Sequence, residues 1–279
     1  MLINNTPVEV YPVAGRDIYV KREDLCCPFP GPAFSKIRGV AAHIQNRPEE
    51  VIGVLDTYHS KAGWAVAYVC QQLGKKAVNY WPRYKDDEGK GDLPRFQQQH
   101  AHDPLGARMV AIKAGRSAIL YHAAGKHMRE NFPGSYLMPN ALKLPESITE
   151  NAAEAIRTAP ELPSGGTLLI SISSGTVAAG VMKGLREVGL LDRYHVVLHM
   201  GYSRSHDAVA EYIAKAAGFA PGVLLVDEGY GYADAAPKDA AAPFPCNPYY
   251  DLKAWAWLTR PGTLDGLPPG PVVFWNIGD

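Results

Sequence analysis

A lysine at the junction of a strand-like stretch and a helix-like stretch is the first residue whose position suggests chemistry. Lys36 lies in the polar segment Gly31-Pro-Ala-Phe-Ser-Lys-Ile-Arg-Gly39, after the stretch Ile18–Leu25 and at the start of the helical run Ile37–Ile44. Open α/β sheets bind their ligands at such turns. A partly desolvated lysine has a lowered pKa, so its amine can form a Schiff base. A lone lysine at a helix start is more often solvated, and on these residues alone both interpretations stay open.

A second polar segment, Asp56-Thr-Tyr-His-Ser-Lys-Ala-Gly63, follows the apolar stretch Val51–Leu55 and precedes a helical run of small and apolar residues. Hydroxyl groups such as that of Ser60, together with backbone N–H groups at a helix start, form a natural carboxylate site. Simple N-capping by Thr57 or Ser60 explains the same residues equally well.

A third polar segment, Ser171-Ile-Ser-Ser-Gly-Thr176, joins the strand-like stretch Thr167–Ile170 to the helical run that starts at Val177. A turn of this kind points several N–H groups and hydroxyls at one place, with the positive end of the helix behind them, which suits a phosphate. Neither GxxxxGK[ST] nor GxGxxG occurs in the chain. A turn of small residues that serves tight packing is the alternative.

The elements that must position these segments alternate along the chain. Near-continuous apolar runs that alternate with helical runs predict an α/β fold with mostly parallel sheets, open and twisted, and with helices on both faces. The expected strands are Ile18–Val20, Val51–Leu55, Ala77–Trp81, Met109–Ile112, Leu168–Ile172, His195–His199, Val223–Val226 and Val272–Trp275. The expected helices are Ile37–Gln45, Ala62–Leu73, Ser117–Asn131, Ser147–Thr158, Val177–Val188 and Asp207–Ala217.

The amino-acid composition fits many functions but argues against some classes of protein. The chain has 279 residues, of which 47% are hydrophobic and 20% charged, as in a globular protein large enough for two lobes. Lys+Arg and Asp+Glu both number 28, so the net charge of 0 argues against a general attraction to nucleic acid or to an anionic membrane. No signal peptide or membrane span is visible, and the four cysteines form neither CxxC nor a zinc-type spacing. A cytoplasmic protein without a metal is expected.

The three polar segments, in this order, resemble those of the fold type II family of pyridoxal-phosphate-dependent enzymes, which is tryptophan synthase β-subunit-like. Ala33-Phe-Ser-Lys-Ile-Arg-Gly39 resembles the family's Ser-Phe-Lys-x-Arg-Gly segment, which implies that Lys36 is the Schiff-base lysine. Ser173-Ser-Gly-Thr176 resembles the Gly-Ser-Gly-Gly-Thr phosphate cup. The resemblance thus implies that Ser173, Ser174, Gly175 and Thr176 hold the phosphate of pyridoxal 5′-phosphate.

The remaining matches are closest to the D-cysteine desulfhydrase and aminocyclopropane-carboxylate deaminase branch. Asn247-Pro-Tyr-Tyr-Asp-Leu-Lys253 is similar to that branch's Asp-Pro-Val-Tyr-x-Gly-Lys, which implies an active-site role for Tyr250 as a proton donor or leaving-group contact. The resemblance implies that Ser60 belongs to the loop that binds the substrate carboxylate. In the same loop, His59 stands where the family usually has Asn beside the cofactor's ring oxygen. In the last segment of the chain, Ile277 stands where the branch has the threonine that faces the ring nitrogen. The neighbouring Asn276 would take over the contact to that nitrogen.

The resemblance implies a lyase or deaminase that acts on a small amino acid or amine by α,β-elimination through Lys36. Alternatives are a β-replacement enzyme that serves nucleotide or DNA modification in a phage, and a non-catalytic relative that only binds a ligand. Residues 1–44 and 140–279 would form the larger, cofactor-binding lobe and residues 45–139 the smaller lobe, with the cofactor between them. A homodimer is expected, as is common in the family.

Overall fold

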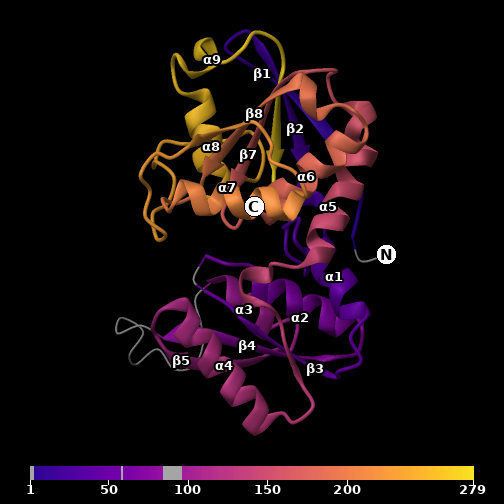
Figure 1. Ribbon diagram of the computed structural model, residues 1–279. Helices are drawn as coiled ribbons and strands as arrows, with labels where there is room; N and C mark the ends of the chain where they lie inside the picture. Colours follow the sequence, from indigo (N-terminus) through magenta and orange to yellow (C-terminus); the bar gives the residue numbers. More distant parts are fainter. Residues whose placement is uncertain (1–2, 58, 84–95) are drawn as a thin grey trace. The chain divides into compact units, whose positions relative to one another are not determined.

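The computed structural model describes residues 3–57, 59–83 and 96–279 (Figure 1). Its contacts define two compact units: unit 1 contains the described residues of 27–32 and 36–146, and unit 2 contains 3–26, 33–35 and 147–279. The expected boundaries at residues 44 and 140 differ from this division. Helix α1 (Ile37–Gln45) falls in unit 1 because it packs against helix α2 (Ala62–Gln72).

Unit 2 is built on a six-stranded sheet with the strand order β1-β2-β10-β7-β8-β9. Strand β1 pairs antiparallel with β2, and every other neighbouring pair is parallel. The carboxyl ends of β2, β10, β7, β8 and β9 therefore lie along one edge of the sheet. The strands are β1 (Val8–Val13), β2 (Arg16–Arg22), β7 (Gly166–Ile172), β8 (Tyr194–Met200), β9 (Val223–Val226) and β10 (Val272–Asn276).

Helices cover both faces of this sheet, because its strands send alternate apolar side chains into two cores. Leu168 and Ile170 of β7 belong to a core shared with α5, α6 and α7. Leu169, between them, belongs to a second core shared with α8 and α9. The helices are α5 (Pro145–Thr158), α6 (Thr176–Glu187), α7 (His206–Ala217), α8 (Asp251–Thr259) and α9 (Thr263–Gly266).

Unit 1 is built on a four-stranded parallel sheet with the order β5-β4-β3-β6. Leu55, Val78 and Tyr80 pack against α4 on one face, and α2 packs against β3 and β4. The elements are β3 (Val51–Leu55), β4 (Lys76–Arg83), β5 (Arg108–Lys113), β6 (Tyr136–Leu137), α3 (Phe96–His102) and α4 (Ser117–Asn131).

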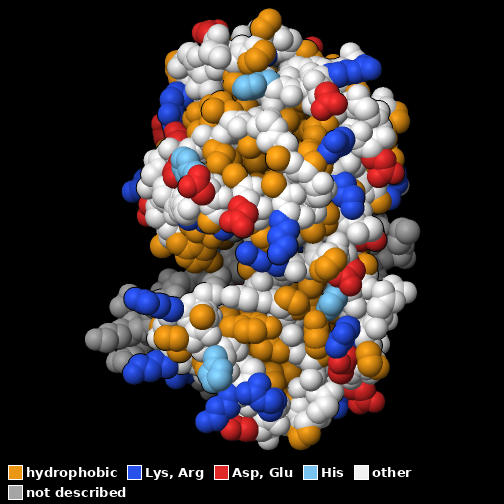
Figure 2. All heavy atoms as spheres, in the orientation of Figure 1, with side chains coloured by type: hydrophobic (Ala, Val, Ile, Leu, Met, Phe, Trp, Pro, Cys, Tyr) orange, Lys and Arg blue, Asp and Glu red, His pale blue; other side chains and the backbone are white. Residues whose placement is uncertain are grey.

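The predicted α/β architecture with mostly parallel sheets is confirmed, and every expected strand and helix is present. Sequence patterns do not reveal β1, β6, α3, α8 and α9. No helix among the described residues is long and apolar enough to cross a membrane. Basic and acidic side chains are interspersed over the face shown in Figure 2, in keeping with the net charge of 0.

Candidate active site

The turn between β7 and α6 contains the residues expected to hold a phosphate. Gly175 has a left-handed backbone with φ 86°, and a Cβ there would lie 2.7 Å from Ile213 Cγ1, so the turn requires glycine. Thr176 Oγ1 shares hydrogen bonds with Ser174 Oγ at 3.0 Å and with Tyr212 OH at 2.8 Å. The first turn of α6 carries no acidic residue. Several hydroxyl groups and the positive end of a helix therefore meet at one place, as an anion site requires.

Tyr250 lies beside this turn, just before helix α8. Its hydroxyl is hydrogen bonded to Tyr232 and to Ser173. The backbone of Gly201 passes close to the ring, since a Cβ on Gly201 would lie 2.8 Å from Tyr250 Cδ1. Burial above all, and then Tyr232, raises the pKa of Tyr250 well above its ordinary value, so the phenol keeps its proton at neutral pH. The structure thus brings two predicted site residues, Tyr250 and Ser173, into contact.

The buried polar atoms near the carboxyl ends of β7 and β10 that have no hydrogen-bond partner within the described part of the chain include Ser35 Oγ, Ser171 Oγ and Asn276 Oδ1. Asn276 Nδ2 donates to Asp24 Oδ1 and to Pro245 O, each at 3.0 Å, and these two acceptors fix which way the amide points. Buried polar atoms are nearly always paired. The unpaired atoms therefore fit a bound group that supplies their partners.

The chain just before Lys36 is attached to the end of β10. Ser35 N donates to Ile277 O at 2.9 Å. A Cβ on Gly278 would lie 2.3 Å from Ala33 O, so this close approach of two backbones also requires glycine. A hydrogen bond thus joins Ile277, the position expected to face a cofactor ring, to Ser35, the residue before the expected Schiff-base lysine.

Lys36 itself is the N-cap residue that precedes helix α1, and it is partly buried. Its Nζ donates to Ala141 O at 3.2 Å, within unit 1. Ala141 has a left-handed backbone with φ 59°, uncommon for alanine, and lies in the short 3-10 helix Asn140–Leu142. The amine of Lys36 is thus hydrogen bonded to a backbone carbonyl oxygen. Its role as a nucleophile stays a prediction.

A buried carboxylate, Asp56, organises the polar segment after β3. It is 1% exposed; Oδ1 accepts from Thr57 N at 2.9 Å and Oδ2 from Gly63 N at 3.0 Å. The Ser60 hydroxyl is hydrogen bonded to the same carboxylate. Burial raises the pKa of Asp56 to about 6, and these donors oppose the shift. Asp56 therefore closes the loop onto the start of α2.

Ser60 also caps α2, since its Oγ accepts from Ala62 N at 3.0 Å. The structure thus shows the capping interaction that the sequence offered as one of two interpretations, and a substrate carboxylate would compete with Asp56 for the hydroxyl proton. His59 is partly buried next to Ser60, and Tyr58 lies outside the described residues. The roles predicted for His59 and Ser60 in binding stay predictions.

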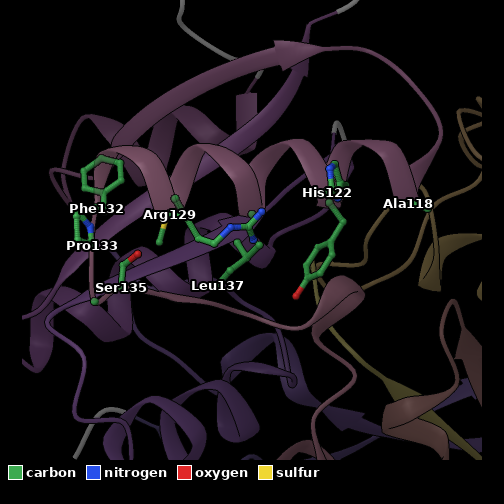
Figure 3. A pocket seen from close by; sticks show the side chains of 11 residues that line it. Ala118, His122, Arg129, Phe132, Pro133, Ser135 and Leu137 are labelled. Carbon is green, nitrogen blue, oxygen red and sulfur yellow. The ribbon is translucent and has the colours of Figure 1, made fainter.

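A separate cavity of about 530 Å³ lies along α4 in unit 1 (Figure 3). Side chains of α4 and of the segment that follows line it, among them His122, Arg129 and Ser135. The residues predicted for the site are not among its lining. The cavity is therefore distinct from the strand ends described above.

Sequence patterns do not single out Asp56, Ser35 or Ser171 as site residues. Asp56 carries a readable signal, because a carboxylate directly after a buried strand is costly unless donors surround it. Ser35 and Ser171 carry no such signal, since small hydroxyl residues are common in turns for local reasons.

Comparison with known proteins gives one extended sequence match. The chain is 71% identical over 281 residues to the glycyl-dTMP PLP-dependent decarboxylase of Pseudomonas phage M6, with 100% of both chains covered. No family model matches the chain.

Several solved structures share the fold at low sequence identity. An ACC deaminase homologue is 18% identical with a TM-score of 0.79, covering 100% of this chain and 90% of its own. Threonine deaminase isoform 2 from Solanum lycopersicum is 18% identical with a TM-score of 0.70, covering 99% and 84%. Serine racemase from Dictyostelium discoideum is 17% identical with a TM-score of 0.67, covering 99% and 92%.

Proposed function

The chain belongs to the fold type II family of pyridoxal-phosphate-dependent enzymes, and we propose that it removes the carboxyl group from a glycyl-bearing thymidine nucleotide. One observation carries the proposal: the 71% identity, along the whole chain, with a glycyl-dTMP PLP-dependent decarboxylase. The family and the cofactor read from the sequence are thereby confirmed. The reaction and the substrate are the proposal.

The residues at the strand ends fit the cofactor. When bound, pyridoxal phosphate supplies an electron sink for the electron pair left on the α-carbon after the carboxyl group departs. Lys36 would hold the cofactor through its amine, and the turn Ser173–Thr176 would bind its phosphate at the start of α6. Asn276 Oδ1, buried and unpaired within the described chain, would accept a hydrogen bond from the ring nitrogen when that nitrogen carries a proton.

Two residues would handle the reacting carbon. Decarboxylation breaks the bond between the α-carbon and the carboxyl carbon, releases CO2 and adds one proton to the α-carbon. Tyr250 retains its phenolic proton at neutral pH and would donate it. Because the Ser60 hydroxyl is hydrogen bonded to Asp56, it is engaged away from the substrate, which favours loss of the substrate's carboxyl group. A hydroxyl that bound the substrate carboxylate would stabilise the charged ground state more than the transition state in which that charge disappears.

The reactions predicted from the sequence differ in what they require of the substrate. α,β-Elimination and β-replacement both need a leaving group on the β-carbon, whereas decarboxylation needs only a free α-carboxylate. The phage relative and its nucleotide-linked substrate support the part of the β-replacement hypothesis that places this chemistry in nucleotide modification. The match of the whole chain to an enzyme supports catalysis over the ligand-binding alternative.

Incubation of the purified, cofactor-loaded protein with glycyl-dTMP tests the proposal. We expect CO2 and a product lighter by the mass of CO2, measured by mass spectrometry. Lys36→Ala should abolish both turnover and the visible absorbance of the bound cofactor. Lys183→Ala, which removes an exposed lysine of α6, is the matched control and should retain both. Release of ammonia without CO2 would contradict decarboxylation and restore elimination.

The homodimer stays a prediction and belongs to the same proposal. Light scattering coupled to size-exclusion chromatography of the loaded protein measures its mass in solution. A mass equal to that of one chain would contradict it.

A further inference from the structure

Two loops at the carboxyl ends of β8 and β9 are tied to each other and to the end of β7. Gly201 N donates to Ile172 O at 2.9 Å, which joins the end of β8 to the end of β7. Ser203 N donates to Tyr230 O at 2.8 Å, and Ser203 Oγ donates to the carboxylate of Asp227. Backbone and side-chain bonds therefore hold both loops in a defined conformation.

The second loop continues as the segment 227–250, which contains neither helix nor strand. Segments of this length without regular structure are uncommon in compact domains, and they are usually functional when they are ordered. This one carries Tyr232 and ends at Tyr250, beside the proposed phosphate turn. It is therefore the natural place for contacts that select a substrate.

Three tyrosines interact with one another at this edge of unit 2. Tyr202 and Tyr232 lie edge to face, with ring centres 5.2 Å apart and an angle of 86° between the ring planes. The hydroxyl of Tyr250 is hydrogen bonded to Tyr232 and to Ser173. Tyr232 is nevertheless 41% exposed, so a large part of its surface remains open to a ligand. A continuous path of contacts thus runs from the phosphate turn to an open aromatic ring.

One cation lies at the far end of that path. Arg204 Cζ is 5.7 Å from the centre of the Tyr202 ring. Its Nη2 is buried and has no hydrogen-bond partner in the described part of the chain. Three other arginines of unit 2, Arg22, Arg157 and Arg260, each pair with a carboxylate. A guanidinium with an unsatisfied buried donor is costly unless an anion occupies the position beside it.

We infer that these residues, the tyrosine–arginine cluster of Tyr202, Arg204, Tyr232 and Tyr250, bind the nucleotide part of the substrate. Arg204 holds the 5′-phosphate, and the open ring of Tyr232 contacts the pyrimidine. A guanidinium matches a phosphate monoester with two parallel donors, and aromatic rings accept a base on their faces. The inference rests on the proposed function, because the nucleotide comes from there. It adds which residues select that nucleotide.

The test measures binding of dTMP and thymidine to the cofactor-loaded protein by calorimetry, so it does not depend on turnover. Arg204→Ala should weaken dTMP binding about 10- to 100-fold, the range expected for hydrogen bonds to a charged group. It should leave the affinity for thymidine, which lacks the phosphate, within about twofold of the wild type. Tyr232→Leu should weaken both ligands about tenfold, and Tyr232→Phe, which keeps the ring, should weaken neither.

Arg186→Ala is the matched control for Arg204. Arg186 also packs its guanidinium over an aromatic ring, with Cζ 4.2 Å from the centre of the Phe219 ring, but it lies in the last turn of α6. This variant should bind both ligands like the wild type. Equal visible absorbance of all variants shows that the cofactor is loaded equally.

The outcomes separate this inference from the proposed function. Equal dTMP affinity of wild type and Arg204→Ala, or no dTMP binding by the wild type, overturns the inference even if glycyl-dTMP is decarboxylated. Binding of an oligothymidylate in place of dTMP also overturns it, because the ligand would then be DNA. Arg204-dependent binding of dTMP supports the inference even if the protein fails to decarboxylate glycyl-dTMP.

Discussion

Gly63, the second residue of α2, should not tolerate even a methyl group. A Cβ at this position would lie 2.0 Å from Asn79 Nδ2 and 2.4 Å from Asp56 Oδ2. Asn79 is 0% exposed and Asp56 1% exposed, so neither side chain can turn into solvent. The hydrogen bond from Gly63 N to Asp56 Oδ2, at 3.0 Å, runs through the same space. Gly63→Ala therefore overpacks this space and also costs the bond to a buried carboxylate.

The size of the effect follows from these terms. Overpacking a core costs about 1–3 kcal/mol. A lost hydrogen bond to a charged group costs about 1.5–3 kcal/mol. Alanine returns about 1 kcal/mol through its higher helix propensity. We expect Gly63→Ala to lower the free energy of unfolding by about 2–4 kcal/mol.

Urea unfolding, followed by circular dichroism at neutral pH, measures the change. Gly125→Ala is the matched control, because Gly125 is also helical and its added Cβ would meet Arg129 Nη1 only at 3.5 Å. This variant should be as stable as the wild type or up to about 1 kcal/mol more stable. If Gly63→Ala were also as stable as the wild type, the buried network around Asp56 would not exist as described.

Three further predictions concern buried charges. The pKa of Asp56 is about 6 against an ordinary 3.8, so the folded state holds this proton more tightly than the unfolded state does. The free energy of unfolding should therefore fall by about 3 kcal/mol as the pH rises from 3.8 to about 6. Asp56→Asn should remove this fall when urea unfolding is measured across the same pH range. Burial lowers the pKa of Lys253 from 10.5 to about 8, so on raising the pH the folded state loses this proton before the unfolded state does. The free energy of unfolding should therefore rise by about 3 kcal/mol as the pH increases from about 8 to 10.5. The Lys253→Met variant should show no such rise. Lys21 Nζ lies 2.6 Å from Glu154 Oε1 with both side chains 1% exposed, so Lys21→Met should cost about 3–5 kcal/mol in urea unfolding and a second change, Glu154→Gln, should recover part of it. A Lys21→Met variant with wild-type stability would contradict that ion-pair argument.

The order of strands and helices was predictable because the signals are local. Val51–Leu55 and Ile37–Gln45 occur with the bounds that their apolar patterns predict. Each is a run of one periodicity that ends at a polar or glycine-containing junction, and such junctions change little with tertiary context. The turn at Gly175 was predictable for the same reason, since its glycine and hydroxyl residues are contiguous in sequence.

Other elements escape prediction because their character depends on burial. Strand β1 (Val8–Val13) contains Pro12 and lies at a sheet edge, where proline is tolerated but weakens the strand pattern. Helix α8 (Asp251–Thr259) contains two tryptophans and carries the buried Lys253, so its apolar and polar residues do not form a simple stripe.

Contacts between distant segments were the least predictable part of the site. Nothing local in the sequence places Tyr232 against Tyr202 or leaves Nη2 of Arg204 without a partner among the described residues. These features depend on how two loops settle on the ends of β8 and β9. Loops lie outside the hydrogen-bonded register of the sheet, so periodicity carries no information about them.

The two kinds of site residue in unit 2 should therefore respond differently to change. Asn276 is 0% exposed and ends a central strand, so a substitution there disturbs both the sheet and any group bound at its edge. Tyr232 is 41% exposed on a loop, so a substitution there can alter ligand contacts while the strands keep their register. A scaffold of this kind can hold one cofactor while its loops are adapted to different substrates. It follows that loops after β8 and β9, more than the phosphate turn, should decide which amino acid derivative this enzyme accepts.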